Sequence, residues 1–297
     1  MFQGLLFSLI SGITYGLLGI FVKFGYMFDM SAFDMLQQRF IYGALAIFIY
    51  IQLKDRSLLK TSRSTIIKAA ILGLIIYPAQ SWLFMQSFKL IPASTAVLTF
   101  YLYPVTVTIL TAIFFKTPIT RLTILSLFIV LGGCSLVFFD AFANKVDMIG
   151  IYYALAAMFV FSINLTFCQK VLSGQKPLTI SFYVMLFAGL FFCAVNSPEN
   201  IIADNMNQFW IGLGLGLIPT ALSISLLYFA IELVGSSYAS IFSTVEPIST
   251  IVAGSILLGE QIFALQIIGM FFIIIGIIVP NIPEIRQRRL LLKNNTG

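Results

Sequence analysis

KLIPASTAVLTFYLYP (residues 89–104) recurs in diverged form as ELVGSSYASIFSTVEP (residues 232–247). At an offset of 143 residues the two stretches share Leu90/Leu233, Ser94/Ser237, Ala96/Ala239 and Pro104/Pro247. The same offset superposes the apolar segments around them, and near the N-terminus the matching offset is about 146 residues. We infer that the chain contains two copies of one structural unit.

The composition excludes a water-soluble fold. Of 297 residues, 60% are hydrophobic and 9% are charged, and the mean hydropathy is +1.02, whereas soluble chains are roughly a quarter charged. A helix of roughly 20 apolar residues crosses the hydrocarbon core of a bilayer, and runs this long differ from the alternating strands of a barrel. The sequence therefore predicts an all-α polytopic membrane protein with ten helices, at about 3–25, 33–53, 66–87, 93–115, 122–139, 148–169, 178–197, 208–230, 236–257 and 262–281.

Each copy of the repeat would contain five of these helices. Because five is an odd number, two tandem copies enter the membrane from opposite sides and are related by an axis in the membrane plane. We therefore predict ten transmembrane helices as two inverted five-helix repeats. Residues 3–139 would form the first repeat, 148–281 the second, and 282–297 a basic cytoplasmic tail.

Basic residues predict the orientation. One side of the predicted topology carries 13 lysine and arginine residues, including the tail, and the other carries three, Lys23, Lys89 and Lys145. The side richer in Lys and Arg faces the cytoplasm. We expect a multi-pass protein of the cell inner (plasma) membrane with both termini cytoplasmic. The net charge of +6 then comes mostly from the basic residues that orient the protein in the membrane. We therefore expect no nucleic-acid partner.

The residue inventory argues against catalysis. The chain has no histidine, which excludes Ser-His and Cys-His nucleophiles and the HExxH metalloprotease motif. The three cysteines stand singly in apolar stretches without metal-ligand spacing. All aspartates fall in loops or at helix ends, whereas aspartyl intramembrane proteases need two within their helices. We expect no enzyme activity, no catalytic residue, no cofactor and no metal.

Two prolines lie at matched depth in the repeat. Pro104 and Pro247 each fall about eleven residues into their predicted helices, near the bilayer midplane. A helical proline removes a backbone hydrogen bond and kinks the helix. Kinked helices in two inverted halves are where an alternating-access site is expected, so we assign both prolines as hinge or gating residues.

Two charges lie well inside predicted helices, away from their ends. Glu246 directly precedes Pro247, and Arg39 lies about two turns into the second segment. An acidic group at the bilayer centre costs roughly 2.5 to 3.5 kcal/mol, so Glu246 must face protein, water or a partner. Arg39 either binds an anionic substrate group or pairs with Glu246, and the residues leave both alternatives open.

Other polar and aromatic side chains cluster on helix faces. They could line a cavity with aromatic walls or join helices through hydrogen bonds. For the cavity we predict the substrate-binding residues Tyr15, Arg39, Gln80, Trp82, Tyr101, Tyr103, Asn164, Tyr228, Ser243 and Glu246.

TVEPISTIVAGSILLGEQ (244–261), followed by QIIGMFFIIIGIIV (266–279), resembles the second-repeat signature of the EamA family in the drug/metabolite transporter (DMT) superfamily. In the first half, QQRF (37–40) and Pro104 are similar to family positions. That half departs from the pattern with Tyr103 in place of Glu and Phe115-Lys116-Thr117 in place of Gly-Glu. The resemblance covers nearly the whole chain. It implies a ten-helix exporter-type carrier of the bacterial inner membrane that moves amino acids, other metabolites or toxic compounds through a central cavity.

We therefore expect a secondary transporter that exports small metabolites, such as amino acids or toxic analogues, by alternating access. An importer or exchanger of a nucleotide-like or other metabolite and a channel stay as alternatives. The expected partners are a small-molecule substrate, the lipid bilayer and protons, with Glu246 as the titratable candidate for coupling. Facilitated diffusion fits the residues equally well. The chain could act as a monomer or a homodimer.

Overall fold

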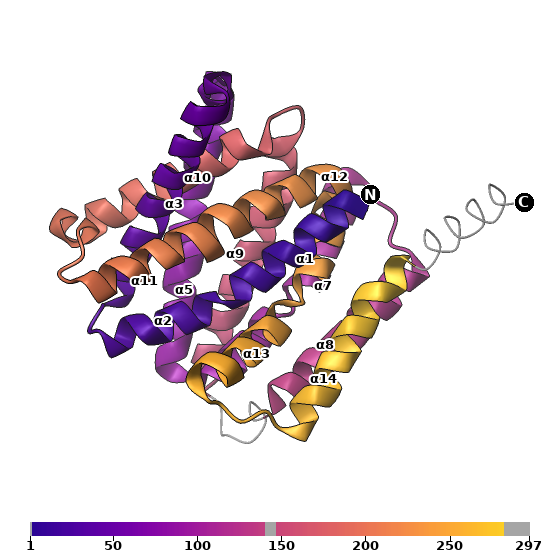
Figure 1. The fold of residues 1–297 in the computed structure, drawn as a ribbon. Coiled ribbons are helices and arrows are strands. Elements are labelled where there is room, and N and C mark those ends of the chain that lie inside the picture. The colour runs from indigo at the N-terminus through magenta and orange to yellow at the C-terminus, as the bar shows by residue number, and fades with distance from the viewer. Residues whose placement is uncertain (1, 140–146, 282–297) are drawn as a thin grey trace, which may run out of the picture.

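The computed structural model describes residues 2–139 and 147–281, and every regular element in these ranges is a helix (Figure 1). The first half comprises α1 (Phe2–Gly16), α2 (Leu18–Met27), α3 (Ala32–Lys54), η1 (Arg56–Leu59), α4 (Arg63–Ala70), η2 (Ile71–Ile76), α5 (Tyr77–Leu90), α6 (Ala93–Phe100), α7 (Tyr103–Phe115) and α8 (Arg121–Val137). The second half comprises α9 (Met148–Leu172), α10 (Pro177–Val195), η4 (Pro198–Ile201), α11 (Met206–Gly216), η5 (Leu217–Leu222), α12 (Ser223–Ser243), α13 (Glu246–Leu258), α14 (Ala264–Ile278) and η6 (Val279–Asn281). The all-helical prediction is confirmed. Lys145 and the predicted basic tail at 282–297 lie outside the described residues.

The helices agree with a protein that crosses a membrane several times. Among the described residues, six helical runs are long and apolar enough to do so, and they are Phe2–Met27, Arg63–Leu90, Ser94–Phe115, Met148–Leu172, Pro177–Val195 and Met206–Ser243. The helices α8, α13 and α14 are apolar but only 10–17 residues long. All ten predicted segments fall on helices, while the number of ten spans stays a prediction.

One predicted boundary between segments is a sharp turn at a single residue. The sequence predicts separate segments at 208–230 and 236–257, and α12 consists of two helical parts that meet at Gly235, within this gap. Only Gly235 departs from helical geometry, with φ 80° and ψ 161°, a conformation that glycine adopts at little steric cost. Beside the kink, Gln169 of α9 accepts hydrogen bonds from the Ser236 backbone N–H (2.6 Å) and hydroxyl (2.7 Å). A side chain from another helix thus caps the segment that follows Gly235.

Both predicted proline kinks are helix breaks. The segment predicted at 93–115 is divided between α6 and α7, and the one at 236–257 is divided between α12 and α13. Pro104 and Pro247 each occupy the first turn of the new helix, α7 and α13. A proline is tolerated there because the first backbone N–H groups of a helix have no intrahelical partner. The breaks therefore stand at equivalent positions of the two repeats.

Two π-helical segments also correspond between the halves. Ile71–Ile76 (η2) and Leu217–Leu222 (η5) interrupt long helices, and an offset of 146 residues relates them. Single π-turns inside α-helices are frequent at functional sites, because they change the direction of the side chains that follow. Tyr77 and Ser223 directly follow these segments.

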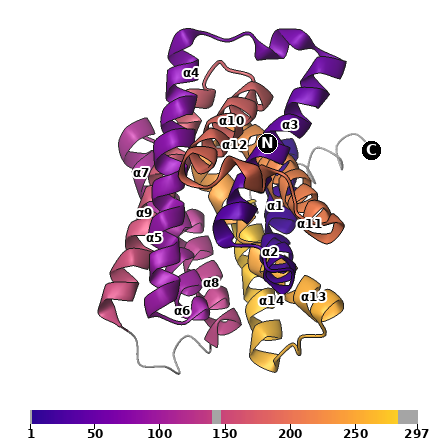
Figure 2. The same ribbon diagram turned by 90° about the vertical axis from the view of Figure 1, so that its left-hand side faces the viewer.

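Packing arranges the broken helices around a common centre. α1 runs beside α12, and α5 runs beside α9 (Figures 1 and 2). α3 packs against α10 and α11, while α8 and α14 form a pair at the edge of the molecule (Figure 1). The centre is therefore surrounded by α1, α5, α6, α7, α9, α12 and α13.

Candidate functional site

A small cavity lies at this centre, where the two helix breaks meet α1, α5 and α9. Its volume is about 40 Å³. It is lined by Ser11, Gly12, Tyr15, Tyr77, Phe100, Tyr103, Phe161, Leu165, Ser223, Ile224, Leu227, Ser243 and Glu246. The lining is mostly apolar and aromatic with a few polar groups, as in most small-molecule sites.

Aromatic rings form one wall of the cavity. The Phe161 ring lies 5.1 Å from the Phe100 ring and 5.1 Å from the Tyr103 ring, centroid to centroid. Phe161 and Tyr103 meet edge to face, with 78° between the ring planes. Such contacts between α6, α7 and α9 hold the rings in place, because aromatic pairs favour tilted geometries. The wall offers ring faces to anything that occupies the cavity.

The lining follows the internal repeat. The offset of 143 residues relates Tyr103 to Glu246 and Phe100 to Ser243, and all four side chains line the cavity. The offset of 146 residues relates two further lining pairs, Tyr15/Phe161 and Tyr77/Ser223. Each half thus contributes the same positions but different chemistry.

Glu246 is the charged residue of this lining. It opens α13, where the positive end of the helix dipole favours a carboxylate. The side chain is partly buried, and the Tyr101 hydroxyl is its hydrogen-bonding neighbour. Arg39 interacts with it electrostatically. Because Glu246 lines the cavity, a ligand in the cavity can contact its side chain directly.

Arg39 is buried beside the cavity and belongs to a different hydrogen-bond network. Its Nε donates to the Thr220 hydroxyl of η5 (2.7 Å), and its guanidinium lies 5.4 Å from the Tyr15 ring centroid. Its Nη2 has no hydrogen-bond partner among the described residues. The one ion pair within 4 Å in that part of the chain joins Lys23 to Glu260. Direct pairing of Arg39 with Glu246 is therefore not formed in this conformation.

Serine side chains join α1 to α12 at the cavity. The Ser8 hydroxyl donates to the Ala239 carbonyl (2.6 Å), and the hydroxyls of Ser11 and Ser223 each donate to the other residue's carbonyl (both 2.8 Å). The predicted polar faces therefore connect helices, and Ser11 and Ser223 also line the cavity. These two serines therefore do both things that were expected of the polar faces, because they join helices and line a cavity.

Close approach of α1 to the second helix break depends on two glycines. A Cβ atom on Gly12 would lie 2.7 Å from the Ser243 carbonyl oxygen. One on Gly16 would lie 2.6 Å from the Glu246 carbonyl oxygen. These distances are too short for any larger residue, so the Gly12xxxGly16 spacing is a close-packing motif.

The structure divides the predicted binding residues into three groups. Tyr15, Tyr103, Ser243 and Glu246 line the cavity. The second group lies directly behind the lining and consists of Arg39, Tyr101 and Tyr228, whose hydroxyl lies beside Tyr77. The third group, outside the cavity lining, consists of Gln80, Trp82 and Asn164.

Helix rotation places the third group outside the cavity lining in this conformation. Trp82 is 53% exposed on the outer surface of α5, and its ring packs against Tyr153. Asn164 is buried, with its amide nitrogen unpartnered, and lies one residue before the lining residue Leu165. Hydropathy does not report which side of a membrane helix faces the protein centre, since lipid and protein interior are both apolar.

Three aromatic lining residues are missing from the predicted set, namely Tyr77 and the two phenylalanines of the aromatic wall, Phe100 and Phe161. A usable signal was present, because the repeat offsets relate Phe100 to Ser243 and Phe161 to Tyr15. Both partners were predicted as binding residues. Applying the internal repeat to the candidate residues would have identified this wall.

Known proteins with similar sequences and folds agree with these observations. A sequence model of the EamA-like transporter family matches residues 2–139 and 148–282. An uncharacterized transporter of Clostridium kluyveri is 25% identical over 290 residues, or 94% of this chain and 93% of that protein. The uncharacterized transporter YcbK of Bacillus subtilis is 26% identical over 165 residues, or 52% of this chain and 51% of that protein. A protein crystal structure that is 13% identical superposes with a TM-score of 0.78 over 97% of this chain and 98% of that chain, and therefore shares the fold.

Proposed function

Because the chain belongs to the EamA-like transporter family, we propose that it is a secondary transporter that exports small amine-bearing metabolites, such as amino acids or their toxic analogues, by alternating access. Transport itself follows from the family. The direction, the substrate class and a ten-helix inverted-repeat mechanism are the proposal.

The observation that carries the proposal is the meeting of two broken helices at one cavity. Pro104 and Pro247 begin the second parts of these helices, and the residues directly before them, Tyr103 and Glu246, both line the cavity. Breaks at equivalent positions of two halves allow each half to tilt around a fixed site. A packing role alone would not require both breaks to face the same cavity.

The cavity in this conformation is closed around its centre. Its volume of about 40 Å³ is close to the share of one water molecule, roughly 30 Å³. A metabolite the size of an amino acid needs several times more space. Substrate binding therefore requires the halves to separate on one side, as alternating access demands.

The chemistry of the lining favours a protonated amine. Glu246 supplies the acidic group of the lining, and the faces of Tyr15, Tyr103 and Phe161 attract cations through their ring quadrupoles. Arg39 lies behind Tyr15, and its Nη2 has no partner within residues 2–139 and 147–281, which suits the carboxylate of a zwitterion. An amino acid carries both groups.

The test is substrate counterflow in proteoliposomes, using a panel of radiolabelled amino acids and amines. Wild type should show saturable counterflow of at least one of them, and Glu246→Gln should lower the rate at least tenfold. Glu199→Gln is the matched control, because Glu199 is exposed and lies outside the cavity. Single-channel currents in place of counterflow would support a pore. Equal rates for Glu246→Gln and wild type would remove Glu246 from substrate recognition.

Proton coupling would also use Glu246, the carboxyl group of the cavity lining. We propose that an inwardly directed proton gradient stimulates export through this residue. The same proteoliposomes test it with a pH gradient of one unit. Stimulation of wild type and its loss in Glu246→Gln support coupling, whereas an unchanged wild-type rate indicates facilitated diffusion.

A further inference from the structure

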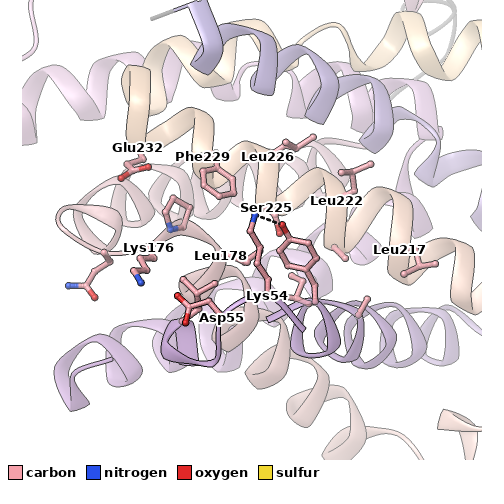
Figure 3. A pocket seen from close by; sticks show the side chains of 17 residues that line it. Lys54, Asp55, Lys176, Leu178, Leu217, Leu222, Ser225, Leu226, Phe229 and Glu232 are labelled. Carbon is pink, nitrogen blue, oxygen red and sulfur yellow. Dashed lines mark hydrogen bonds between the residues drawn. The ribbon is translucent and has the colours of Figure 1, made fainter. Parts of the chain in front are cut away.

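A larger cavity lies between α3, α10 and α12, separate from the central site (Figure 3). Its volume is about 830 Å³. α12 divides the two cavities. Ser223, Ile224 and Leu227 face the central cavity, whereas Leu222, Ser225 and Phe229 line the larger one. At 3.6 residues per turn these two sets lie on opposite faces of the helix. The larger cavity therefore lies on the side of α12 that faces away from the central cavity, and we call it the lateral groove.

The two ends of the groove differ in polarity. Figure 3 shows Leu217 and Leu222 at one end, and these side chains are 40% and 46% exposed. At the other end stand Asp55, Lys176 and Glu232, with Lys54 between them and the apolar end. A groove that is apolar at one end and charged at the other matches an amphipathic ligand.

The charged end can receive a phosphate. Lys54 and Lys176 are exposed there, and α10 begins directly after Lys176 without a side-chain cap. The first backbone N–H groups and the dipole of an uncapped helix favour an anion. Lys176 and the α10 N-terminus thus lie at this end of the groove, and Lys54, whose Nζ donates to the Tyr50 hydroxyl (2.8 Å), lines the groove next to them.

The same end also presents negative charge. Glu232 is exposed on α12 and forms no ion pair within 4 Å in residues 2–139 and 147–281. Asp55 is held by Ser57, whose side chain and backbone donate to it, and these hydrogen bonds lower the pKa of Asp55. Glu232 is therefore the carboxylate that can receive a ligand ammonium group.

A buried hydroxyl inside the groove has no partner. Ser225 lines the groove, is 7% exposed, and its Oγ makes no hydrogen bond to any described residue. A buried polar atom without a partner is costly, and an acceptor on a ligand in the groove would satisfy it. Ser225 lies seven residues before Glu232, or about 10 Å along the helix axis. That separation is comparable to the headgroup layer of a bilayer leaflet, roughly 5–8 Å.

We propose that the groove binds a glycerophospholipid whose headgroup contains both a phosphate and a primary amine. Lys54, Lys176 and the α10 N-terminus hold the phosphate, and Glu232 holds the amine. Ser225 donates to an ester carbonyl, and an acyl chain follows Leu222 and Leu217. The lysine excess in the loops between helices predicts that this end faces the cytoplasmic leaflet. The proposal is independent of the transported substrate.

Native mass spectrometry of the purified full chain in detergent tests this, with dioleoyl phosphatidylethanolamine, phosphatidylcholine and phosphatidylglycerol titrated separately. Wild type should bind the ethanolamine lipid at least fivefold more tightly than the other two. Glu232→Gln should remove this preference while leaving phosphatidylglycerol binding intact. Lys54→Ala/Lys176→Ala should weaken all three lipids.

Control variants distinguish loss of the proposed lipid contacts from a general effect of changing charge or folding. Lys60→Ala and Glu199→Gln change charges outside the groove and should bind lipid like wild type. Ser225→Ala removes only the buried hydroxyl and should weaken ethanolamine lipid binding severalfold, with size-exclusion profiles confirming that the variant is folded. Equal binding by Glu232→Gln and wild type would overturn the proposal. Tighter binding of phosphatidylglycerol, or displacement of bound lipid by free phosphoethanolamine, would also overturn it.

Discussion

Tyr103 and Glu246 occupy equivalent positions in the two repeats, each directly before a proline, and both side chains line the same cavity. Tyr103 donates to the Ser240 carbonyl of the opposite half (3.3 Å), whereas Glu246 keeps its carboxylate on the cavity. The two halves therefore share a backbone arrangement, while only the second supplies a carboxyl group. The cavity is therefore chemically asymmetric at positions that the internal repeat relates.

The Tyr103 ring should matter more than its hydroxyl. Tyr103→Phe removes one long hydrogen bond, worth about 1 kcal/mol or less, and should change the apparent KM less than threefold. Tyr103→Ala removes the contacts with Phe100 and Phe161 and should lower counterflow at least tenfold. Counterflow kinetics check both variants. Similar losses for Phe and Ala would show that the hydroxyl, and not the ring, serves the substrate.

Substitution of Gly16 should destabilise the protein. A Cβ there meets the Glu246 carbonyl oxygen and the Ser249 side chain, and overpacking of this kind costs about 1–3 kcal/mol. Gly16→Ala should lower the free energy of unfolding by that amount, measured by denaturant titration in mixed micelles. Gly132→Ala is the control, because nothing lies within 4 Å of a Cβ at Gly132. A stable Gly16→Ala would contradict the close contact of α1 with α13.

Gln169 should stabilise the kink at Gly235 through its side-chain oxygen. Gln169→Leu removes the acceptor for the Ser236 N–H and hydroxyl and should cost about 0.5–2 kcal/mol, as loss of a helix cap does. Gln169→Glu keeps an acceptor beside a helix N-terminus and should stay close to wild type. The same unfolding titration distinguishes them. Equal stability of the two variants would remove the capping role.

Arg39 and Thr220 should be energetically coupled. Their side chains meet through one hydrogen bond of 2.7 Å to a buried guanidinium, and hydrogen bonds to charged groups contribute about 1.5–3 kcal/mol. A double-mutant cycle with Arg39→Met and Thr220→Val measures this coupling. We expect an interaction energy within that range. Additive effects of the two substitutions would mean that Arg39 is held by its aromatic neighbours instead.

The Lys23–Glu260 ion pair should contribute little to stability. The two side chains are 54% and 47% exposed, and exposed pairs are worth at most about 1 kcal/mol and weaken with salt. A cycle with Lys23→Met and Glu260→Gln at low and high salt measures the coupling. A coupling that is larger and insensitive to salt would indicate that this pair is shielded from water and holds α2 to the end of α13.

Much of the architecture could be predicted because lipid restricts the available structures. Long apolar runs require helices, since backbone groups in hydrocarbon must pair within the segment. The repeat at 89–104 and 232–247 contains both proline breaks, so residue spacing alone locates them. The predicted gap between residues 230 and 236 contains the turn at Gly235 in α12, but hydropathy does not show that one residue with positive φ makes this turn.

Sequence alone thus determined the helical class, the family resemblance and the pairing of Tyr103 with Glu246. These depend on residue type, spacing and repetition along the chain. Tertiary structure decided which side chains meet. The rotation of each helix is set by packing against its neighbours, which turned Trp82 outward and Phe161 inward. Packing also placed Arg39 where it donates a hydrogen bond to Thr220, and it placed Glu246 in the lining of the cavity.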